Sequence, residues 1–333
     1  MCWSSRFQQR ICFLLCHSLF LYSSFLLGQR YVVYSPQLSE EHPKCTCACT
    51  PQNLRSSEVT PALATARFAE ANIDKSDKTK YHNYHIMYGP ALGPFLQKPV
   101  RLLEIGVNNG KSLKLWQRLF PNHEFIAGVG YGSGTAVQKS FKRMLTDKHV
   151  LYTGSQANSE FLSRILEDLN GKKFDIIVDD GSHVPWHQIF TLEYMFDKFL
   201  NDGGVYIIED VETSYWDRPG ASLYGYPISN AGIGKQGNVV EKLKGVADTL
   251  NRGMLLDPTF SILHGNVDHL MSHITFSQNC VIMNKKHQED WKQAEHNTVH
   301  NYHNPSNMEP TRNDYLQYKS TAVWDISGME RTS

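Results

Sequence analysis

The sequence lacks an excess of charge of either sign. Among its 333 residues are 33 Lys and Arg and 33 Asp and Glu, so the formal net charge is zero. Proteins that bind nucleic acid electrostatically carry a basic excess, and disordered interaction tails carry long blocks of one sign. Neither feature is present here. The sequence therefore gives no reason to expect a nucleic-acid partner.

Glycosylation motifs, internal repeats and paired cysteines are also missing. The only N-x-Ser/Thr triplet, at 304–306, is excluded by its proline. Of the seven cysteines, three lie in or before an apolar N-terminal run, three form C-x-C-x-C at 45–49, and Cys280 stands alone. The C-x-C-x-C run lacks the second pair that a zinc site requires. We interpret it as disulfide-bonded or lipidated thiols in a stem.

The N-terminal run, "ICFLLCHSLFLYSSFLLG" at 11–28, has no charged side chain and is preceded by Arg6 and Arg10. Its length is about the minimum for a membrane-spanning helix. No clear small-x-small cleavage site follows it. We therefore predict that residues 1–30 form an uncleaved signal anchor of a single-pass type II protein facing the ER or Golgi lumen, with the membrane as a partner. A cleaved signal of a secreted protein, an organellar targeting segment and a wrong start codon are the alternatives.

The rest of the chain divides into a linker at 31–72, a patterned domain at 73–286 and a polar tail at 287–333. Strand-like runs are expected at 100–107, 123–130, 174–180 and 203–210, with two more within 259–284; helices are expected at 112–120, 159–169, 185–200 and 235–251. Such β-α alternation is typical of a parallel sheet covered by helices on both faces. We predict an α/β fold with a doubly wound, mostly parallel, Rossmann-like sheet of about seven strands.

The first predicted strand ends in a glycine-rich turn, E-x-G-x-x-x-G, formed by Glu104, Gly106 and Gly110. Glycines let the backbone turn tightly and approach a ligand before a helix begins. The spacing differs from the G-x-G-x-x-G pattern of dinucleotide-binding proteins. An acidic residue just before the first glycine suits a ligand that carries an ammonium group.

Two later strands end in carboxylates. "FDIIVDDGSH" contains Asp180 and His183, and "YIIEDVETSYW" contains Glu209 and Asp210. If the strands are neighbours, three carboxylates meet at one edge of the sheet and need a cation among them. All-oxygen ligands suit Mg²⁺, Ca²⁺ or Mn²⁺ rather than Zn²⁺. A histidine beside such a metal can serve as a base near neutral pH.

These motifs resemble those of a known family of enzymes. The glycine turn resembles the first motif of class I S-adenosylmethionine-dependent methyltransferases. More specifically, the stretches "SDKTKYHNY", "RLLEIGVNNGKSLKLW", "LFPN", "GSQ", "FDIIVDDGSH", "GGVYIIEDVETSYW" and "SQNCVIMNKK" are similar, in the same order, to metal-dependent macrolide sugar O-methyltransferases of the mycinamicin and demethylmacrocin type. The resemblance covers roughly residues 73–286 and implies the class I methyltransferase fold.

The resemblance also implies roles for individual residues. Asp180, Glu209 and Asp210 would hold Mg²⁺ or Mn²⁺, and His183 would take the proton of a sugar hydroxyl. The S-adenosylmethionine site would include Glu104, Gly106, Gly110, Ser155 and Gln156, with Asp179 shaping its border. Asp77, His82 and Tyr84 match the segment that borders the active site. From their position just after the carboxylates, Tyr215 and Trp216 are expected either to line the acceptor pocket or to pack internally.

One position departs from the family pattern. Such methyltransferases carry an acidic residue for the ribose hydroxyls at the end of the second strand, where this sequence has Gly130. The leading hypothesis is an O-methyltransferase (an EC 2.1.1 enzyme) acting on a glycosylated small molecule or a glycan. The alternatives are a catalytically weakened methyltransferase-like binding module, which Gly130 motivates, and an O-methyltransferase of a small catechol or phenol. A homo-oligomer is compatible with each of these three functions.

Overall fold

The computed structural model describes residues 59–131, 140–235, 237–252, 255, 257, 259–287 and 289. All of them belong to one folding unit. The predicted signal anchor, most of the linker and nearly all of the polar tail lie outside the described residues.

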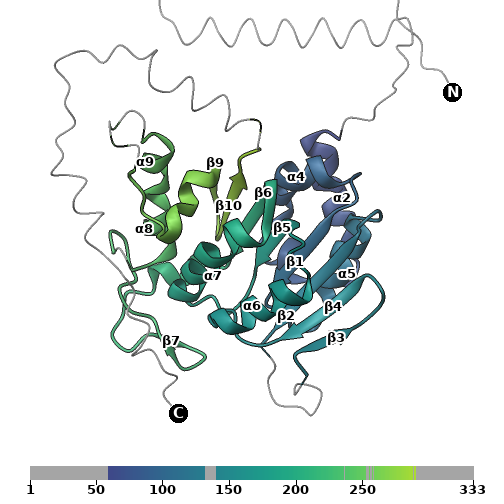
Figure 1. Ribbon diagram of the computed structural model, residues 1–333, viewed down its shortest axis with the longest axis horizontal. Coiled ribbons are helices and arrows are strands. Elements are labelled where there is room, and N and C mark those ends of the chain that lie inside the picture. Colours follow the sequence, from purple (N-terminus) through teal and green to yellow (C-terminus); the bar gives the residue numbers. More distant parts are fainter. Residues whose placement is uncertain are drawn as a thin grey trace, which may run out of the picture. The chain divides into compact units, whose positions relative to one another are not determined.

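A mixed eight-stranded sheet forms the centre of this unit (Figure 1). In spatial order its strands are β3 (Lys142–Met144), β4 (His149–Thr153), β2 (Phe125–Gly130), β1 (Arg101–Ile105), β5 (Phe174–Asp179), β6 (Leu200–Glu209), β10 (Cys280–Lys285) and β9 (Met271–Ser277). The strands from β4 to β6 are parallel, whereas β3 and β10 run antiparallel to their neighbours. The chain order reverses between β1 and β5, which is where ligands bind in such sheets.

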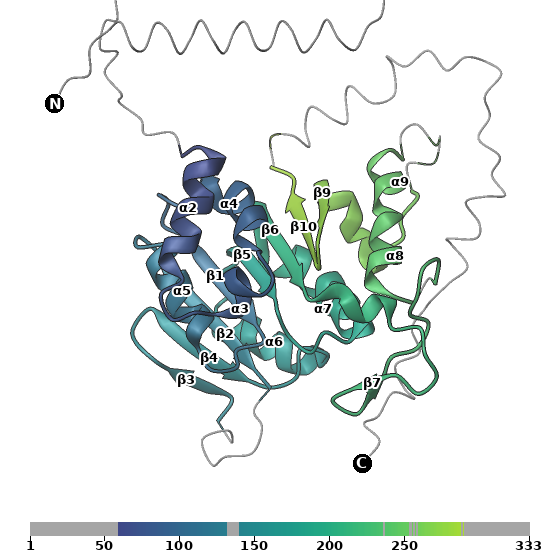
Figure 2. The same cartoon turned by 180° about the vertical axis from the view of Figure 1, so that it is seen from behind.

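Helices cover both faces of the sheet. The front face in Figure 1 carries α6 (Ser159–Asp168), α7 (Pro185–Lys198), α8 (Val239–Lys244) and α9 (Val246–Leu250). The opposite face, seen in Figure 2, carries α2 (Pro61–Ala71), α4 (His85–Leu92) and α5 (Lys111–Leu119). Short connecting elements are α3 (Asp77–Lys80), η1 (Gly93–Phe95), η3 (Val211–Tyr215), η4 (His264–Leu270) and a ribbon of β7 (Ser222–Leu223) and β8 (Tyr226–Pro227).

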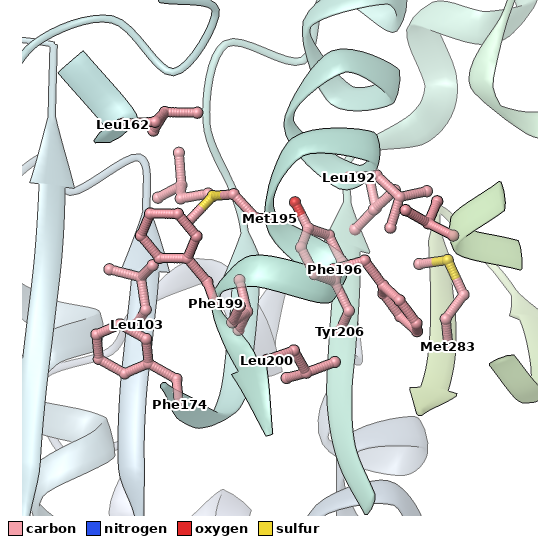
Figure 3. Close-up of a cluster of buried hydrophobic side chains, with 14 of the residues drawn as sticks. Leu103, Leu162, Phe174, Leu192, Met195, Phe196, Phe199, Leu200, Tyr206 and Met283 are labelled. Atoms are coloured by element: carbon pink, nitrogen blue, oxygen red, sulfur yellow. The ribbon is translucent and has the colours of Figure 1, made fainter. Parts of the chain in front are cut away.

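A hydrophobic core lies on each face of the sheet. Each strand contributes to both cores, because successive side chains point to opposite faces. In β1, Leu102 packs with α2, α4 and α5, while Leu103 belongs to the core under α6 and α7. Figure 3 shows part of this second core, where Met195 and Phe196 of α7 lie beside Tyr206 of β6. Burial of these apolar faces holds the helices against the sheet. The predicted doubly wound α/β architecture is confirmed.

Two boundaries and one additional strand differ from prediction. The linker does not extend to residue 72, because Thr60 caps helix α2 and Phe68 of that helix is buried in the core. The sheet has an eighth strand, since residues 142–144 pair with β4 as a short antiparallel edge. The helix predicted at 235–251 begins only at Val239, where the Asn238 side chain accepts a hydrogen bond from the backbone N–H of Glu241, and it breaks at Gly245.

Candidate active site

Strand alternation gathers three carboxylates on the face covered by α2, α4 and α5. Glu104 lies two positions after Leu102 in β1, and Glu209 lies two after Ile207 in β6, so each shares that side of its strand. Asp180 follows β5 in the same phase as Val178. The side chains of Glu104 and Glu209 are buried, and Asp180 is partly exposed. The sheet therefore concentrates negative charge beside the switch point between β1 and β5.

A lysine, Lys78 of α3, lies among these carboxylates. Its Nζ is 2.7 Å from Asp180 Oδ2 and 2.7 Å from each carboxylate oxygen of Glu209, and 3.6 Å from Glu104 Oε1. The Lys78 side chain is completely buried. The Tyr88 hydroxyl of α4 donates a further hydrogen bond to Glu209 Oε1. Both oxygens of Glu209 are thus occupied by donors from the N-terminal helices.

The charges in this cluster do not balance. Burial acts to lower the pKa of Lys78, but attraction to Asp180, Glu209 and Glu104 outweighs burial and raises that pKa well above its usual value. Burial raises the pKa of Glu104 to about 7 and also raises the pKa of Asp180 and Glu209, in spite of Lys78. One ammonium serves three carboxylates. A second cation nearby would relieve the remaining repulsion.

The residues that could hold such a cation lie on the outer side of Asp180. Asp180, His183 and Asp210 each offer one ligand atom, and these atoms lie within 4.8 Å of one another. His183 Nε2 is 4.0 Å from Asp180 Oδ1 and 3.7 Å from Asp210 Oδ2, too far for hydrogen bonds. All three side chains are partly exposed. Carboxylate oxygens suit Mg²⁺ or Mn²⁺, and the gap among the three groups suits a small ligand.

The loops that present this group are held in specific conformations. His183 and Asp210 both have positive φ, 57° and 53°, which is uncommon for residues other than glycine and occurs preferentially at functional sites. Thr213 Oγ1 donates a 2.5 Å hydrogen bond to the His183 carbonyl. Asp210 Oδ1 accepts hydrogen bonds from the Tyr84 hydroxyl at 2.5 Å and from Asn279 Nδ2 at 2.9 Å. Asp210 Oδ2 is left facing His183.

Two of the three carboxylates predicted to hold the metal belong to this group, and the third lies beside it. Asp180 and Asp210 lie together as expected, but Glu209 faces inward to Lys78 and Tyr88. The reason is the alternation of side chains along a strand. Glu209 is the last residue of β6, and its side chain points to the face covered by α2, α4 and α5. Asp210 follows with a positive φ, which turns its side chain outward. His183 takes the third place in the group.

The glycine turn after β1 fits a bound cofactor. Gly106 has φ 101°, and a Cβ there would collide with the Asp180 backbone, so the loops after β1 and β5 approach as only glycine allows. Gly110, at the N-terminus of α5, has open space where a side chain would project. Glu104 lies deeper: Ser112 Oγ donates to its Oε2 at 2.8 Å, and its buried Oε1 has no hydrogen-bond partner among the described residues.

Two of the predicted cofactor residues, Gln156 and Asp179, belong to one hydrogen-bond network, and their role at the cofactor stays a prediction. Gln156 Nε2 donates to Asp179 Oδ1 at 3.0 Å and to Thr191 Oγ1 at 3.1 Å, and Gln156 Oε1 accepts from the backbone N–H of Ser182 at 2.7 Å. Asp179 is completely buried on the α7 side of β5, and burial raises its pKa to about 7. These side chains hold the Asp180–His183 loop in place. Ser155 is partly exposed beside them.

Some of the predicted substrate residues lie near Asp210 or line a pocket, and others do not. Tyr84 contacts Asp210, and His82 stacks on Tyr84 with its Nδ1 3.7 Å from Asp210 Oδ1. Tyr215 is half-exposed and lines a pocket together with His82. Asp77 is exposed in the first turn of α3, and Trp216 packs against a small cluster of Ala221, Ile228 and Ala231. Of the two expectations for Trp216, this contact agrees with internal packing, and a role in the acceptor pocket stays a prediction.

Sequence reasoning missed Lys78, Tyr88 and Asn279. Lys78 and Tyr88 lie in or just after "SDKTKYHNY", and the excess of buried acids could have indicated that a cation comes from this segment. The prediction assigned that cation to a metal alone. Asn279, in the turn between β9 and β10, lies in the quoted stretch "SQNCVIMNKK", but the local sequence does not indicate its contact with Asp210, which spans 69 residues.

The chain is similar in sequence to curated sugar O-methyltransferases. It is 36% identical over 160 residues to L-olivosyl-oleandolide 3-O-methyltransferase of Streptomyces antibioticus, which covers 46% of this chain and 37% of the relative. It is 33% identical over 148 residues to 8-demethyl-8-alpha-L-rhamnosyl tetracenomycin-C 2'-O-methyltransferase of Streptomyces olivaceus, covering 42% and 36%. The chain thus matches little more than a third of each relative's length. No protein-family model matches the chain.

Solved structures of one methyltransferase share the fold. The MycE methyltransferase from the mycinamycin biosynthetic pathway, in complex with Mg and SAH, aligns at 26% identity with a TM-score of 0.53, covering 68% of this chain and 53% of that one. Its complex with Mg, SAH and mycinamycin VI aligns at 25% identity with a TM-score of 0.50, covering 70% and 56%. The predicted resemblance to macrolide sugar O-methyltransferases is confirmed, and the fold is Rossmann-like.

These findings correct the predicted localisation. The curated relatives are enzymes of Streptomyces, bacteria that have no ER or Golgi. In the part of the chain that the structure describes, no helix has the length and apolar character needed to cross a membrane. The prediction of a type II protein facing the ER or Golgi lumen is therefore withdrawn. The segment 11–28 itself lies outside the described residues.

Proposed function

We propose that this protein is a Mg²⁺-dependent O-methyltransferase that uses S-adenosylmethionine and acts on a sugar hydroxyl of a glycoside. The observation that carries the proposal is the group formed by Asp180, His183 and Asp210 at the carboxyl edge of the sheet. Its support from relatives is twofold: the similar curated enzymes are named as O-methyltransferases of glycosylated compounds, and the similar solved structure is named as a complex with Mg and SAH.

The residues that would hold the metal are Asp180 and Asp210, with their outward oxygens. When bound, the metal would supply a Lewis acid for the acceptor oxygen, and S-adenosylmethionine would supply an electrophilic methyl group. The unbalanced charge around Lys78 supports this assignment, because three carboxylates face its single ammonium. S-adenosylmethionine would lie along the turn of Gly106 and Gly110, where the space beside Gly110 is open.

The base would be His183. The proton of the acceptor hydroxyl would pass to its Nε2 while the hydroxyl oxygen forms a bond to the methyl carbon and the carbon–sulfur bond breaks. The protein contributes mainly alignment, since the transfer is an in-line displacement. Thr213 holds the His183 loop by a hydrogen bond, and Tyr84 and Asn279 hold Asp210 in the same way. These contacts keep His183 Nε2 and Asp210 Oδ2 3.7 Å apart.

A direct test is calorimetry on the full chain with S-adenosylmethionine and S-adenosylhomocysteine, with and without Mg²⁺. Binding of either compound, followed by methyl transfer to a glycoside in the presence of Mg²⁺, is expected. Absence of binding under every condition would overturn the proposal.

A second candidate is a methyltransferase-like binding module that has lost activity. The observation in its favour is Gly130, which ends β2 without the carboxylate expected for ribose. The Asp180, His183 and Asp210 group counts against it, because these partly exposed side chains lie close enough together to serve metal-assisted catalysis. Binding of S-adenosylhomocysteine without turnover on any glycoside would favour the module. A catechol or phenol acceptor receives no support from the relatives' names.

A further inference from the structure

Two histidines contact each other at the amino ends of the parallel strands. His123 lies in the loop between α5 and β2, and His149 is the first residue of β4, the parallel neighbour of β2 (Figure 1). Asp180 and Asp210 follow the carboxyl ends of β5 and β6, which run in the same direction as β2 and β4. The histidine pair therefore lies at the opposite end of the strands from the candidate active site.

The rings of the histidine pair meet through their Nε2 atoms. His123 Nε2 is 2.8 Å from His149 Nε2, and the ring centroids are 4.9 Å apart. Two imidazole nitrogens that bind one metal ion at about 2.0–2.1 Å lie roughly 3 Å from each other. Both residues are partly exposed, so an ion can reach them from solvent. A small rotation of the rings would bring both nitrogens to ligand distance from one ion.

The second nitrogen of each ring already has a partner. His123 Nδ1 is 2.7 Å from the Phe120 carbonyl, which can only accept, so Nδ1 carries the proton and Nε2 carries a lone pair. His149 Nδ1 is 2.8 Å from the Thr146 hydroxyl, which can donate or accept. Histidines that bind metals in proteins hold their second nitrogen in this way, because the outer hydrogen bond fixes the orientation of the ring.

One proton separates the present contact from a metal site. Since His123 Nε2 is the acceptor, His149 Nε2 donates the hydrogen bond between the rings. When an ion binds, His149 would carry this proton on Nδ1 instead, and Thr146 Oγ1 would accept it. The ring stays neutral, and its Nε2 lone pair becomes available to the ion. Thr146 thus allows either arrangement of the proton without the loss of a hydrogen bond.

The ligand chemistry of the histidine pair differs from that of the candidate active site. Neutral imidazole suits Zn²⁺ and Cu²⁺, whereas Mg²⁺ prefers carboxylate and water oxygens. Among the described residues, Asp180, His183 and Asp210 are the only three metal-ligating side chains grouped around one point, so the pair has no third such ligand. A tetrahedral Zn²⁺ would complete its coordination with two waters.

We propose that His123 and His149 form a Zn²⁺ site. The bound ion would join the loop after α5 to the start of β4. It would stabilise this end of the sheet, because an ion that binds only the folded chain shifts the equilibrium towards it. The inference does not depend on the proposed function, since no residue of the candidate active site takes part.

The test is calorimetric titration of the full chain with ZnCl₂ in excess Mg²⁺. His123→Gln and His149→Gln should each weaken the same binding event by at least about tenfold, because the remaining imidazole no longer acts as part of a chelate. The double variant should lose no more than either single variant. The other histidines, including those of the polar tail, are the same in all these proteins and cancel in the comparison.

His273→Gln is the matched control, because His273 is exposed on β9 at the far edge of the sheet. It should keep the wild-type titration. Circular dichroism should show that Zn²⁺ raises the Tm of the wild type more than that of the double variant. An unchanged titration in the double variant would overturn the inference and leave the pair as a hydrogen bond only.

A second measurement needs only the wild type. Diethyl pyrocarbonate modifies accessible imidazole nitrogens, and mass spectrometry locates the modified residues. Zn²⁺, in contrast to Mg²⁺, should slow the modification of His123 and His149 by at least about tenfold, because both Nε2 atoms would be bound to the ion. Equal rates at these two residues with and without Zn²⁺ would overturn the inference.

Discussion

The ammonium of Lys78 lies 2.7 Å from each carboxylate oxygen of Glu209, and both side chains are buried. The ion pair joins α3, in the N-terminal segment, to the end of β6, 131 residues later. It accounts for the position of α3 against the sheet. It also directs Glu209 inward, so that Asp180 and Asp210 are left as the carboxylates that face outward.

Replacing Lys78 by methionine should destabilise the protein strongly. Methionine fills similar space but leaves buried carboxylates unpaired, which typically costs about 3–5 kcal/mol. Urea unfolding followed by circular dichroism measures the change. Lys80→Met, two residues along and exposed, is the control and should have little effect. A Lys78→Met, Glu209→Gln double variant should recover part of the loss; equal stability of Lys78→Met and the control would contradict the ion-pair interpretation.

Metal affinity should depend on Asp210 more than on Glu209. Asp210→Asn removes an outward ligand, and we expect at least about a tenfold weaker affinity for Mn²⁺, since a ligand carboxylate is lost. Glu209→Gln removes a charge that already pairs with Lys78, so its effect should be smaller. Electron paramagnetic resonance of free Mn²⁺ reports both affinities. A larger loss in Glu209→Gln would restore Glu209 as a ligand.

Replacing His183 by alanine should remove turnover and retain cofactor binding. General bases contribute roughly 10²–10⁴-fold to rate, so kcat should fall by about that factor. The side chain is on the acceptor side of the site, and affinity for S-adenosylhomocysteine should stay near the wild-type value. His264→Ala, on η4 and outside the site, serves as the control. Unchanged kcat in His183→Ala would remove His183 from the mechanism.

Restoring a carboxylate at the end of β2 should strengthen cofactor binding. Gly130 does not have positive φ, and an added Cβ would approach the Val107 carbonyl to 3.3 Å, so an aspartate fits with a small shift. A hydrogen bond to a charged group contributes about 1.5–3 kcal/mol, equivalent to roughly ten- to hundredfold in affinity. Gly130→Ala adds the Cβ without the carboxylate and is the control. Equal affinities of the two variants would show that ribose does not meet this position.

Stability should fall as His187 is forced to take a proton. Burial lowers the pKa of His187 from 6.5 to about 3, so the folded protein favours the neutral ring. The unfolded chain binds a proton below about pH 6.5, and stability is therefore full above that pH and lost progressively as pH falls towards 3, by up to about 1.4 kcal/mol per pH unit. Urea unfolding at pH 7.5 and pH 5 measures the loss. His187→Gln should show a shallower pH dependence; an identical slope would assign the loss to other groups.

Much of the fold could be predicted from local patterns. The strands that end at Ile105, Asp179 and Glu209 are apolar runs bounded by glycine or acidic residues, and their alternation with amphipathic helices specifies a doubly wound sheet. The helix at Pro61–Ala71 was missed because five of its eleven residues are alanine, so it shows only a weak apolar period. Its assignment to the domain depends on Phe68, whose burial comes from contacts with α4 and α5 rather than from local sequence.

The sequence by itself determined the doubly wound architecture, the glycine turn after β1 and the presence of acidic residues and His183 at the ends of neighbouring strands, because all of these follow from local periodicity and turn chemistry. Only the tertiary structure decided which carboxylates face inward. The position of Glu209 in its strand and the positive φ of Asp210 make these two neighbouring side chains point in different directions. Lys78 contacts Glu209 from a helix that is far away in the chain. Charge pairing across such distances depends on packing, and local sequence does not encode its partner.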